Sequence, residues 1–176
     1  MTNTSSPLSA PPCDDLPLID LQADPFTLFE SWMAEAEKTE INDPNAMVLT
    51  TATPDGRPSA RVVLLKGADR RGFVFYTNLE SRKGGELAAN PHVALLFYWK
   101  GLRRQIRIEG GISPVTAEEA DAYFASRSRT SRLGAIASDQ SRPLSSRSVF
   151  EDRLHDAEAR YGEGPIPRPA DWSGYR

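Results

Sequence analysis

Two basic residues stand where a strand is expected to give way to a helix, in the stretch FVFYTNLESRKGGELAANP from Phe73 to Pro91. Ser81, Arg82 and Lys83 fall at the start of that expected helix, which spans residues 82–89. The first backbone N–H groups of a helix have no partner within it, and its dipole is positive at this end. Such a position suits a phosphate group. The alternative is an ordinary solvated helix start that carries surface cations.

Two more side chains could complete a phosphate site from neighbouring strands. Thr77, at the end of the preceding strand, could add a hydroxyl, and Arg61 could add a guanidinium that binds an anion through two N–H groups. The chain has a net charge of −3 and therefore no general attraction for anions. Any anion site must be a local arrangement of cations of this kind.

A second candidate anion site lies on a helix expected after residue 115. Thr116 and Glu119 have the spacing of a capping box, which predicts a helix start in TAEEADAYFASR. Tyr123 and Arg127 are four residues apart, so on one helix a hydroxyl and a guanidinium would lie on the same face and could hold the same ligand. Ser131 would extend that face only if the helix continued. A surface helix whose arginine pairs with a neighbouring acid explains the same spacing.

Five short runs rich in β-branched and aromatic residues predict the strands that position these groups: AMVLTTA, RVVLLK, FVFYT, VALLFYW and RQIRIEGGI. Pro54-Asp55-Gly56 separates the first two runs and residues 67–72 separate the second from the third, which predicts two antiparallel hairpins. Only the third and fourth runs are separated by a helical pattern, which ends at Asn90-Pro91, so a doubly wound sheet is not expected. The predicted fold class is mainly β with appended helices (α+β), as a small barrel.

Helices are expected on both sides of this β region. Asp24 is placed to cap a helix with Pro25 at its first position, and apolar residues recur at helical spacing through FTLFESWMAEAEK. Another amphipathic helix is expected from about Ser145 to Tyr161. Both are interpreted as packing elements.

Length and composition limit the remaining possibilities. A chain of 176 residues with 39% apolar content suits one core, so we expect one domain over residues 21–176 after a disordered N-terminal arm over residues 1–20. Cys13 is the only cysteine, no run is apolar enough to span a membrane, and the start has no secretory pattern, so a cytoplasmic protein is expected. Nucleic-acid binding is not expected of an acidic chain. His92 and His155 have no partner pattern that indicates a metal site or a catalytic triad.

The ordered segments RVVLLK, FYTN, SRK, RRQIRIEG, YFASRSRTSRLGA and SDQS resemble the pyridoxamine 5'-phosphate oxidase family of flavoproteins, over about Asp24 to Arg176. The resemblance implies a flavin mononucleotide (FMN)-binding split β-barrel and a homodimer with FMN at the subunit interface. It implies the oxidation of pyridoxamine or pyridoxine 5'-phosphate to pyridoxal 5'-phosphate, with O2 as acceptor and H2O2 as product. The flavin would carry the redox chemistry, so no residue is assigned as catalytic.

The resemblance also assigns binding residues. The FMN ligands it implies are Arg61, Val62, Val63, Leu64, Leu65, Lys66, Tyr76, Thr77, Arg82, Lys83, Gln105, Gln140 and Ser141. Among these, Arg61 would reach the flavin phosphate, Arg82 and Lys83 would clamp it, and some of the polar contacts would cross the dimer. The substrate ligands it implies are Lys66, Tyr123, Arg127 and Ser131.

One spacing within this set conflicts with a regular strand. Arg61 and Lys66 are five residues apart, and strict alternation would point them to opposite faces. Either a bulge intervenes, or Arg61 serves the flavin phosphate while Lys66 turns round the end of the strand toward the substrate. We prefer the second interpretation.

Members of the family continue beyond the Trp-x-Gly-Tyr-Arg stretch into strands that contribute to both sites, whereas this sequence stops at Arg176. We therefore expect the family's C-terminal segment to be missing. Two alternatives to the oxidase follow: a relative that binds FMN or a B6 phosphate without turnover, and another split-barrel flavin reductase.

Overall fold

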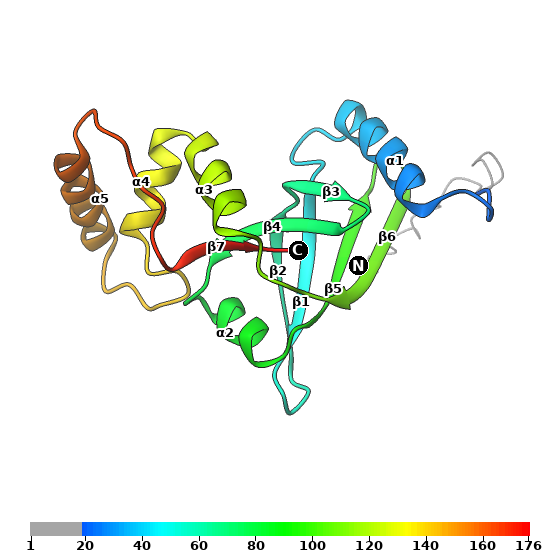
Figure 1. Ribbon diagram of the computed structural model, residues 1–176, viewed down its shortest axis with the longest axis horizontal. Coiled ribbons are helices and arrows are strands. Elements are labelled where there is room, and N and C mark those ends of the chain that lie inside the picture. Colours follow the sequence, from blue (N-terminus) through cyan, green and yellow to red (C-terminus); the bar gives the residue numbers. More distant parts are fainter. Residues whose placement is uncertain (1–18) are drawn as a thin grey trace, which may run out of the picture.

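The computed structural model describes residues 19–176, and these form two antiparallel sheets flanked by helices (Figure 1). The strands are β1 (Ala46–Ala52), β2 (Pro58–Leu64), β3 (Gly67–Asp69), β4 (Gly72–Asn78), β5 (His92–Trp99), β6 (Arg104–Gly111) and β7 (Trp172–Tyr175). The helices are α1 (Pro25–Thr39), α2 (Arg82–Ala89), α3 (Ala117–Ser126), α4 (Arg129–Ala137) and α5 (Arg147–Tyr161). The predicted class of antiparallel β structure with appended helices is confirmed. The expected N-terminal arm lies outside the described residues except for its last two.

The larger sheet has the strand order β2-β1-β5-β6, and the smaller sheet has the order β3-β4-β7. The first predicted hairpin, formed by β1 and β2 of the larger sheet, is confirmed, with Leu49 opposite Arg61. Pairing starts at Pro58, three residues earlier than predicted, because the tight turn at Gly56 (φ +86°) brings Pro58 directly opposite Ala52.

The second predicted hairpin is wrong. Residues 67–72 were expected to be a turn between paired strands, but they include β3, and β4 pairs with β3 and β7 instead of β2. The chain leaves the larger sheet after Leu64, and the backbone N–H of Lys66 donates to the carbonyl of Val74. The real turn is only Arg70 and Arg71, where the Asp69 carboxylate accepts from the Arg71 N–H.

Strand β7 was not predicted. It lies along the free edge of β4, with Thr77 opposite Ser173 and Asn78 opposite Trp172. It therefore joins residues near the end of the described chain to the strand that carries Tyr76 and Thr77.

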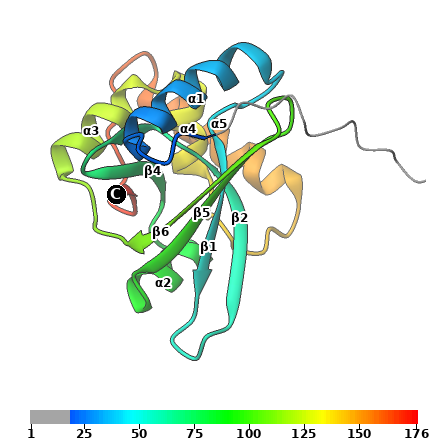
Figure 2. The same ribbon diagram turned by 90° about the vertical axis from the view of Figure 1, so that its right-hand side faces the viewer.

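The main core lies between the two sheets and beneath α1. Phe29 of α1 contacts Phe73 and Phe97 edge to face, with ring centroids 5.0 and 5.3 Å apart. The predicted cap of α1 is confirmed, because Asp24 accepts a hydrogen bond from the N–H of Phe26. Figures 1 and 2 show α1 across one end of the β structure and α2 near the opposite end. No helix among residues 19–176 is long and apolar enough to cross a bilayer.

Candidate functional site

Helix α2 begins at Arg82, as predicted, and its start is held against the end of β4. Ser81 caps it: its hydroxyl accepts from the N–H of Gly84 at 3.2 Å and donates to the carbonyl of Asn78 at 2.7 Å. Gly84 is required by close packing, since a Cβ there would lie 2.0 Å from the Leu79 carbonyl oxygen. This tight return places the first turn of α2 beside the last residues of the strand.

Lys83 contacts two other residues assigned to the cofactor, Thr77 and Gln140. Its ammonium donates to the hydroxyls of Thr77 (3.0 Å) and Ser81 (3.3 Å) and to the side-chain oxygen of Gln140 (2.5 Å). Burial lowers the pKa of Lys83, and the charge of Arg61 lowers it further, while Glu86 opposes the shift. An ammonium whose acceptors in the described part of the chain are all neutral would gain from an anionic partner.

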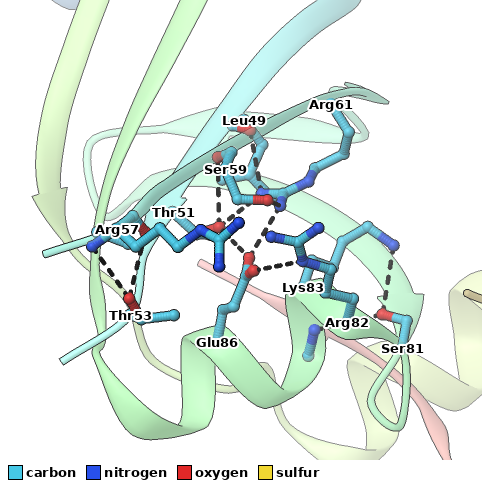
Figure 3. A network of polar contacts seen from close by, with 12 residues as sticks. Leu49, Thr51, Thr53, Arg57, Ser59, Arg61, Ser81, Arg82, Lys83 and Glu86 are labelled. Carbon is cyan, nitrogen blue, oxygen red and sulfur yellow. Dashed lines mark hydrogen bonds and ion pairs between the residues drawn. The ribbon is translucent and has the colours of Figure 1, made fainter. Parts of the chain in front are cut away.

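Glu86 is a residue of the site that the sequence analysis missed. It is 7% exposed, and its two oxygens face three side chains from three elements (Figure 3). Oε2 accepts from the Thr51 hydroxyl at 2.5 Å and from Arg61 at 2.9 Å, and Oε1 accepts from Nε of Arg82 at 2.9 Å. Burial opposes ionisation, but hydrogen bonds from Thr51, Arg82 and Arg61 lower the pKa of Glu86 to about 2. The only sequence signal was the i, i+4 spacing of Arg82 and Glu86.

The two arginines of this network are used differently. Arg61 is 19% exposed, and its terminal nitrogens donate to Leu49 O, Thr51 Oγ1, Ser59 Oγ and Glu86 Oε2. Arg82 is 63% exposed, and within residues 19–176 only its Nε has a partner. The terminal nitrogens of Arg82 therefore remain available to a ligand.

The site as a whole is electropositive. Arg61, Arg82 and Lys83 against Glu86 give a net charge of +2. Together with the N-terminal backbone groups of α2, this arrangement suits a dianionic phosphate.

The assigned run from Arg61 to Lys66 does not present one surface. Arg61 and Val63 face the interior, whereas Val62 and Leu64 are exposed on the outer face of the sheet. The strand ends at Leu64, so Lys66 lies beyond it, as the preferred interpretation required. Its ammonium lies 6.0 Å from the centre of the Tyr123 ring.

A second cluster lies on the other side of β4. Tyr76 stacks on Tyr123, with ring centroids 4.0 Å apart, and on Trp172, at 5.5 Å. Because side chains alternate along a strand, Tyr76 faces this cluster while Thr77 faces Lys83. Trp172 was not assigned to a site from the sequence. Its position depends on β7 pairing with β4, which no local pattern indicated.

The prediction that Tyr123 and Arg127 share one helix face is wrong. Helix α3 ends at Ser126, and Arg127 has an extended backbone (φ −70°, ψ 150°). A new helix, α4, starts two residues later because Ser128 caps it by accepting from the N–H of Ser131. Ser131 therefore lies in the first turn of α4 and does not continue the face of α3.

Arg127 nevertheless reaches the cluster from outside the helix. Its guanidinium lies 4.9 Å from the centre of the Trp172 ring and 5.6 Å from that of Phe124. Burial lowers the pKa of Arg127, and its Nη1 is buried without a hydrogen-bond partner among the described residues. A buried guanidinium nitrogen with no acceptor fits an anionic ligand.

The remaining assigned residues are dispersed. Gln105 is exposed on β6, which is the opposite edge of the larger sheet from β2. Ser141 follows Gln140 in a left-handed conformation (φ +68°). Within residues 19–176, no group of three or more metal-binding side chains was found.

Comparisons with known proteins identify the family and the fold of this chain. The family model described as pyridoxamine 5'-phosphate oxidase matches residues 33–161. A curated relative from Gluconobacter oxydans, named pyridoxine/pyridoxamine 5'-phosphate oxidase, is 74% identical over 162 residues, which are 92% of this chain and 81% of that protein. A relative of the same name from Sphingopyxis alaskensis is 67% identical over 87% of this chain and 71% of its own length.

Solved structures show the same fold. The structure of PhzG from Burkholderia lata, in complex with tetrahydrophenazine-1-carboxylic acid, has a TM-score of 0.83 and 35% identity, over 89% of this chain and 77% of that one. A pyridoxamine 5'-phosphate oxidase-related, FMN-binding protein from Nostoc punctiforme has a TM-score of 0.68 and 17% identity, over 88% of this chain and 81% of that one. The second likeness concerns the fold alone.

Proposed function

The chain belongs to the pyridoxamine 5'-phosphate oxidase family, and from this premise we propose that it binds FMN at the start of α2 and oxidises pyridoxamine or pyridoxine 5'-phosphate. The observation that carries the proposal is the meeting of Lys83, Arg82, Thr77 and the first turn of α2 at one place with a net charge of +2. These groups fit the dianionic phosphate of FMN in charge and in hydrogen-bond donors.

Bound FMN would supply the redox chemistry, in which pyridoxamine 5'-phosphate, O2 and water give pyridoxal 5'-phosphate, ammonia and H2O2. The protein residues hold and orient the reactants. Lys83 and Arg82 would hold the FMN phosphate, with Thr77 and Gln140 beside them. The neutral acceptors that now satisfy Lys83 can give way to phosphate oxygens without leaving a buried charge unpaired.

The cluster across β4 is proposed to hold the substrate. Arg127, with a buried nitrogen that has no acceptor among the described residues, and Lys66 provide positive charge for a second phosphate. Tyr123, whose ring centre lies 6.0 Å from the Lys66 ammonium, would add a hydroxyl, and Ser131 lies in the first turn of α4. The rings of Tyr76, Tyr123 and Trp172 stack nearly parallel to one another, and Lys66 and Arg127 lie against this apolar stack.

We also propose that two copies form a dimer through the outer face of the larger sheet. Val62, at 65% exposed, and Tyr98, at 64%, lie on this face together with Leu64. Apolar side chains gathered on one sheet face favour coverage by another protein surface. Gln105 lies on β6, at the opposite edge of the larger sheet from β2, which carries Arg61, so a contact between Gln105 and FMN would come from the second copy.

The test uses FMN-loaded protein without oxygen. Adding pyridoxamine 5'-phosphate should bleach the flavin absorbance, and admitting O2 should restore it with formation of pyridoxal 5'-phosphate and H2O2. A yellow protein that does not bleach would indicate binding without turnover. Bleaching by a reduced nicotinamide cofactor but not by the B6 substrate would indicate a flavin reductase.

A further inference from the structure

Glu86 occupies an unusual position for an acidic residue, since it is buried at the centre of a site that is otherwise suited to an anion. It lies in the second turn of α2, and both of its carboxylate oxygens are engaged. The family resemblance assigned no role to it.

The carboxylate connects the two arginines of the site. Arg61 has one charged acceptor in the described chain, Glu86, and its other three acceptors are neutral. Among residues 19–176, the side chain of Arg82 is held through Nε alone, at the other carboxylate oxygen. Glu86 therefore holds Arg82 by its Nε and leaves the terminal nitrogens of Arg82 without a partner in the described chain.

Two physical effects of Glu86 on a bound phosphate have opposite signs. Its negative charge repels a phosphate dianion, which would weaken binding. Its hydrogen bonds order Arg61 and Arg82 and keep the cations close together despite their mutual repulsion, which would strengthen binding. We expect the ordering effect to be larger than the repulsion. The buried carboxylate accepts hydrogen bonds from three donors, two of them cationic, so its negative charge is already compensated locally.

We propose that Glu86 is a positioning residue that orders Arg61 and Arg82 for the phosphate of FMN. This inference rests on the proposed function of the α2 site. It predicts that a neutral residue at position 86 weakens FMN binding, although simple charge counting predicts the reverse.

The test compares Glu86→Gln with a matched control, Glu80→Gln. Glu80 is exposed in the turn before α2, and within residues 19–176 its side chain makes no hydrogen bond or ion pair, so the control changes the net charge equally. Calorimetry would measure the affinity of each protein for FMN and for riboflavin, which lacks the phosphate. For Glu86→Gln we expect FMN affinity to fall by about tenfold or more, the effect of one charge-assisted hydrogen bond, with riboflavin affinity within about twofold of wild type.

The control should bind FMN as well as the wild type or slightly better. If Glu86→Gln also binds FMN as well as the wild type or better, the positioning role is refuted. An equal loss of FMN and riboflavin affinity would likewise refute it, since the effect would not act through the phosphate.

A second variant keeps every charge in place. Thr51→Val removes the hydroxyl that donates to Glu86 and accepts from Arg61, at 2.5 and 2.7 Å. It should weaken FMN binding by about threefold or more relative to riboflavin, and Thr51→Ser should restore it. Unchanged FMN binding in a folded Thr51→Val protein would contradict the proposal even if Glu86→Gln fails to fold.

A failure of the proposed function can be told apart from a failure of this inference. If the folded wild type binds no FMN, the proposed function is wrong. The effect of Glu86 on Arg82 can then still be tested by nitrogen NMR of the Arg82 side chain. The Nε–H of Arg82 should be protected from hydrogen exchange in the wild type and should lose that protection in Glu86→Gln. Equal protection in the two proteins would refute the role of Glu86.

Discussion

Replacing Lys83 by methionine should weaken FMN binding strongly while leaving the fold intact. The ammonium of Lys83 is partly buried and has only neutral acceptors within residues 19–176, so a phosphate would add a charged partner. A hydrogen bond to a charged group contributes about 1.5 to 3 kcal/mol, which corresponds to roughly 10- to 150-fold in Kd. Methionine keeps the length of the side chain and removes a desolvated charge, so the free energy of unfolding should change by no more than about 1 kcal/mol.

The assay is titration of the flavin-free protein with FMN and with riboflavin, followed by fluorescence. Lys100→Met, in the exposed turn between β5 and β6, serves as the charge-matched control and should bind FMN like the wild type. An FMN Kd for Lys83→Met within about threefold of wild type would refute our account of the phosphate site. A parallel loss of riboflavin affinity would refute it as well.

The pH dependence gives an independent check on Lys83. Burial lowers the pKa of Lys83 below 10.5 in the free protein, and a bound phosphate would raise it. Above about pH 7, where the FMN phosphate is a dianion, the FMN affinity should therefore stay constant until the pH rises through the free-protein pKa of Lys83, and should then fall. Lys83→Met should lack this decline.

Three further predictions concern stability and the substrate. Gly84→Ala would place a Cβ 2.0 Å from a backbone oxygen and should lower the free energy of unfolding, measured in urea, by about 2 kcal/mol or more. A Cβ at Gly85 would have nothing within 4 Å, so Gly85→Ala should not destabilise the protein. Equal effects of the two substitutions would contradict the packing argument. Because the folded-state pKa of Glu86 is about 2 and its ordinary value is 4.5, its contribution to stability, on the order of 3 kcal/mol, should be complete above pH 4.5 and disappear as the pH falls toward 2. Glu86→Gln should flatten this acid dependence, and an unchanged profile would exclude Glu86 as its source. Trp172→Leu removes the ring that holds the Arg127 guanidinium in place, so it should raise the Kd for pyridoxamine 5'-phosphate about tenfold and leave FMN affinity within about twofold of wild type. Loss of both affinities would indicate a general structural effect.

The features that could be predicted from the sequence are those set by neighbouring residues. The capping residues Asp24, Ser81 and Thr116 each mark a helix start correctly, because the capping side chain bonds to a backbone group two or three residues away. The strand runs and the first hairpin follow in the same way from local alternation and turn residues. The family came from an ordered set of such segments, and no periodicity could have named its cofactor.

Two of the features that were missed, the contacts of Glu86 and of Trp172, depend on residues distant in sequence. Glu86 meets Thr51 and Arg61 only after α2 has packed against the larger sheet, and Trp172 meets Tyr76 only through β7. The break after α3 did have a local signal, since Ser128 precedes Ser131 at capping distance, but the helical pattern on either side concealed it. The assigned FMN and substrate ligands, the dimer, the cytoplasmic location and the absence of nucleic-acid and membrane partners stay predictions.

The pairing of β4 with β7 has a consequence for how the protein matures on the ribosome. β7 leaves the ribosome about 100 residues after β4, which at about 5 to 20 residues per second is a delay of roughly 5 to 20 s. During that interval one edge of β4 is without its partner strand, and an unpaired edge can associate with other nascent chains. We therefore expect the proposed substrate site, which includes Trp172, to be complete only after translation has passed β7, whereas the residues proposed for the FMN phosphate are all synthesised earlier.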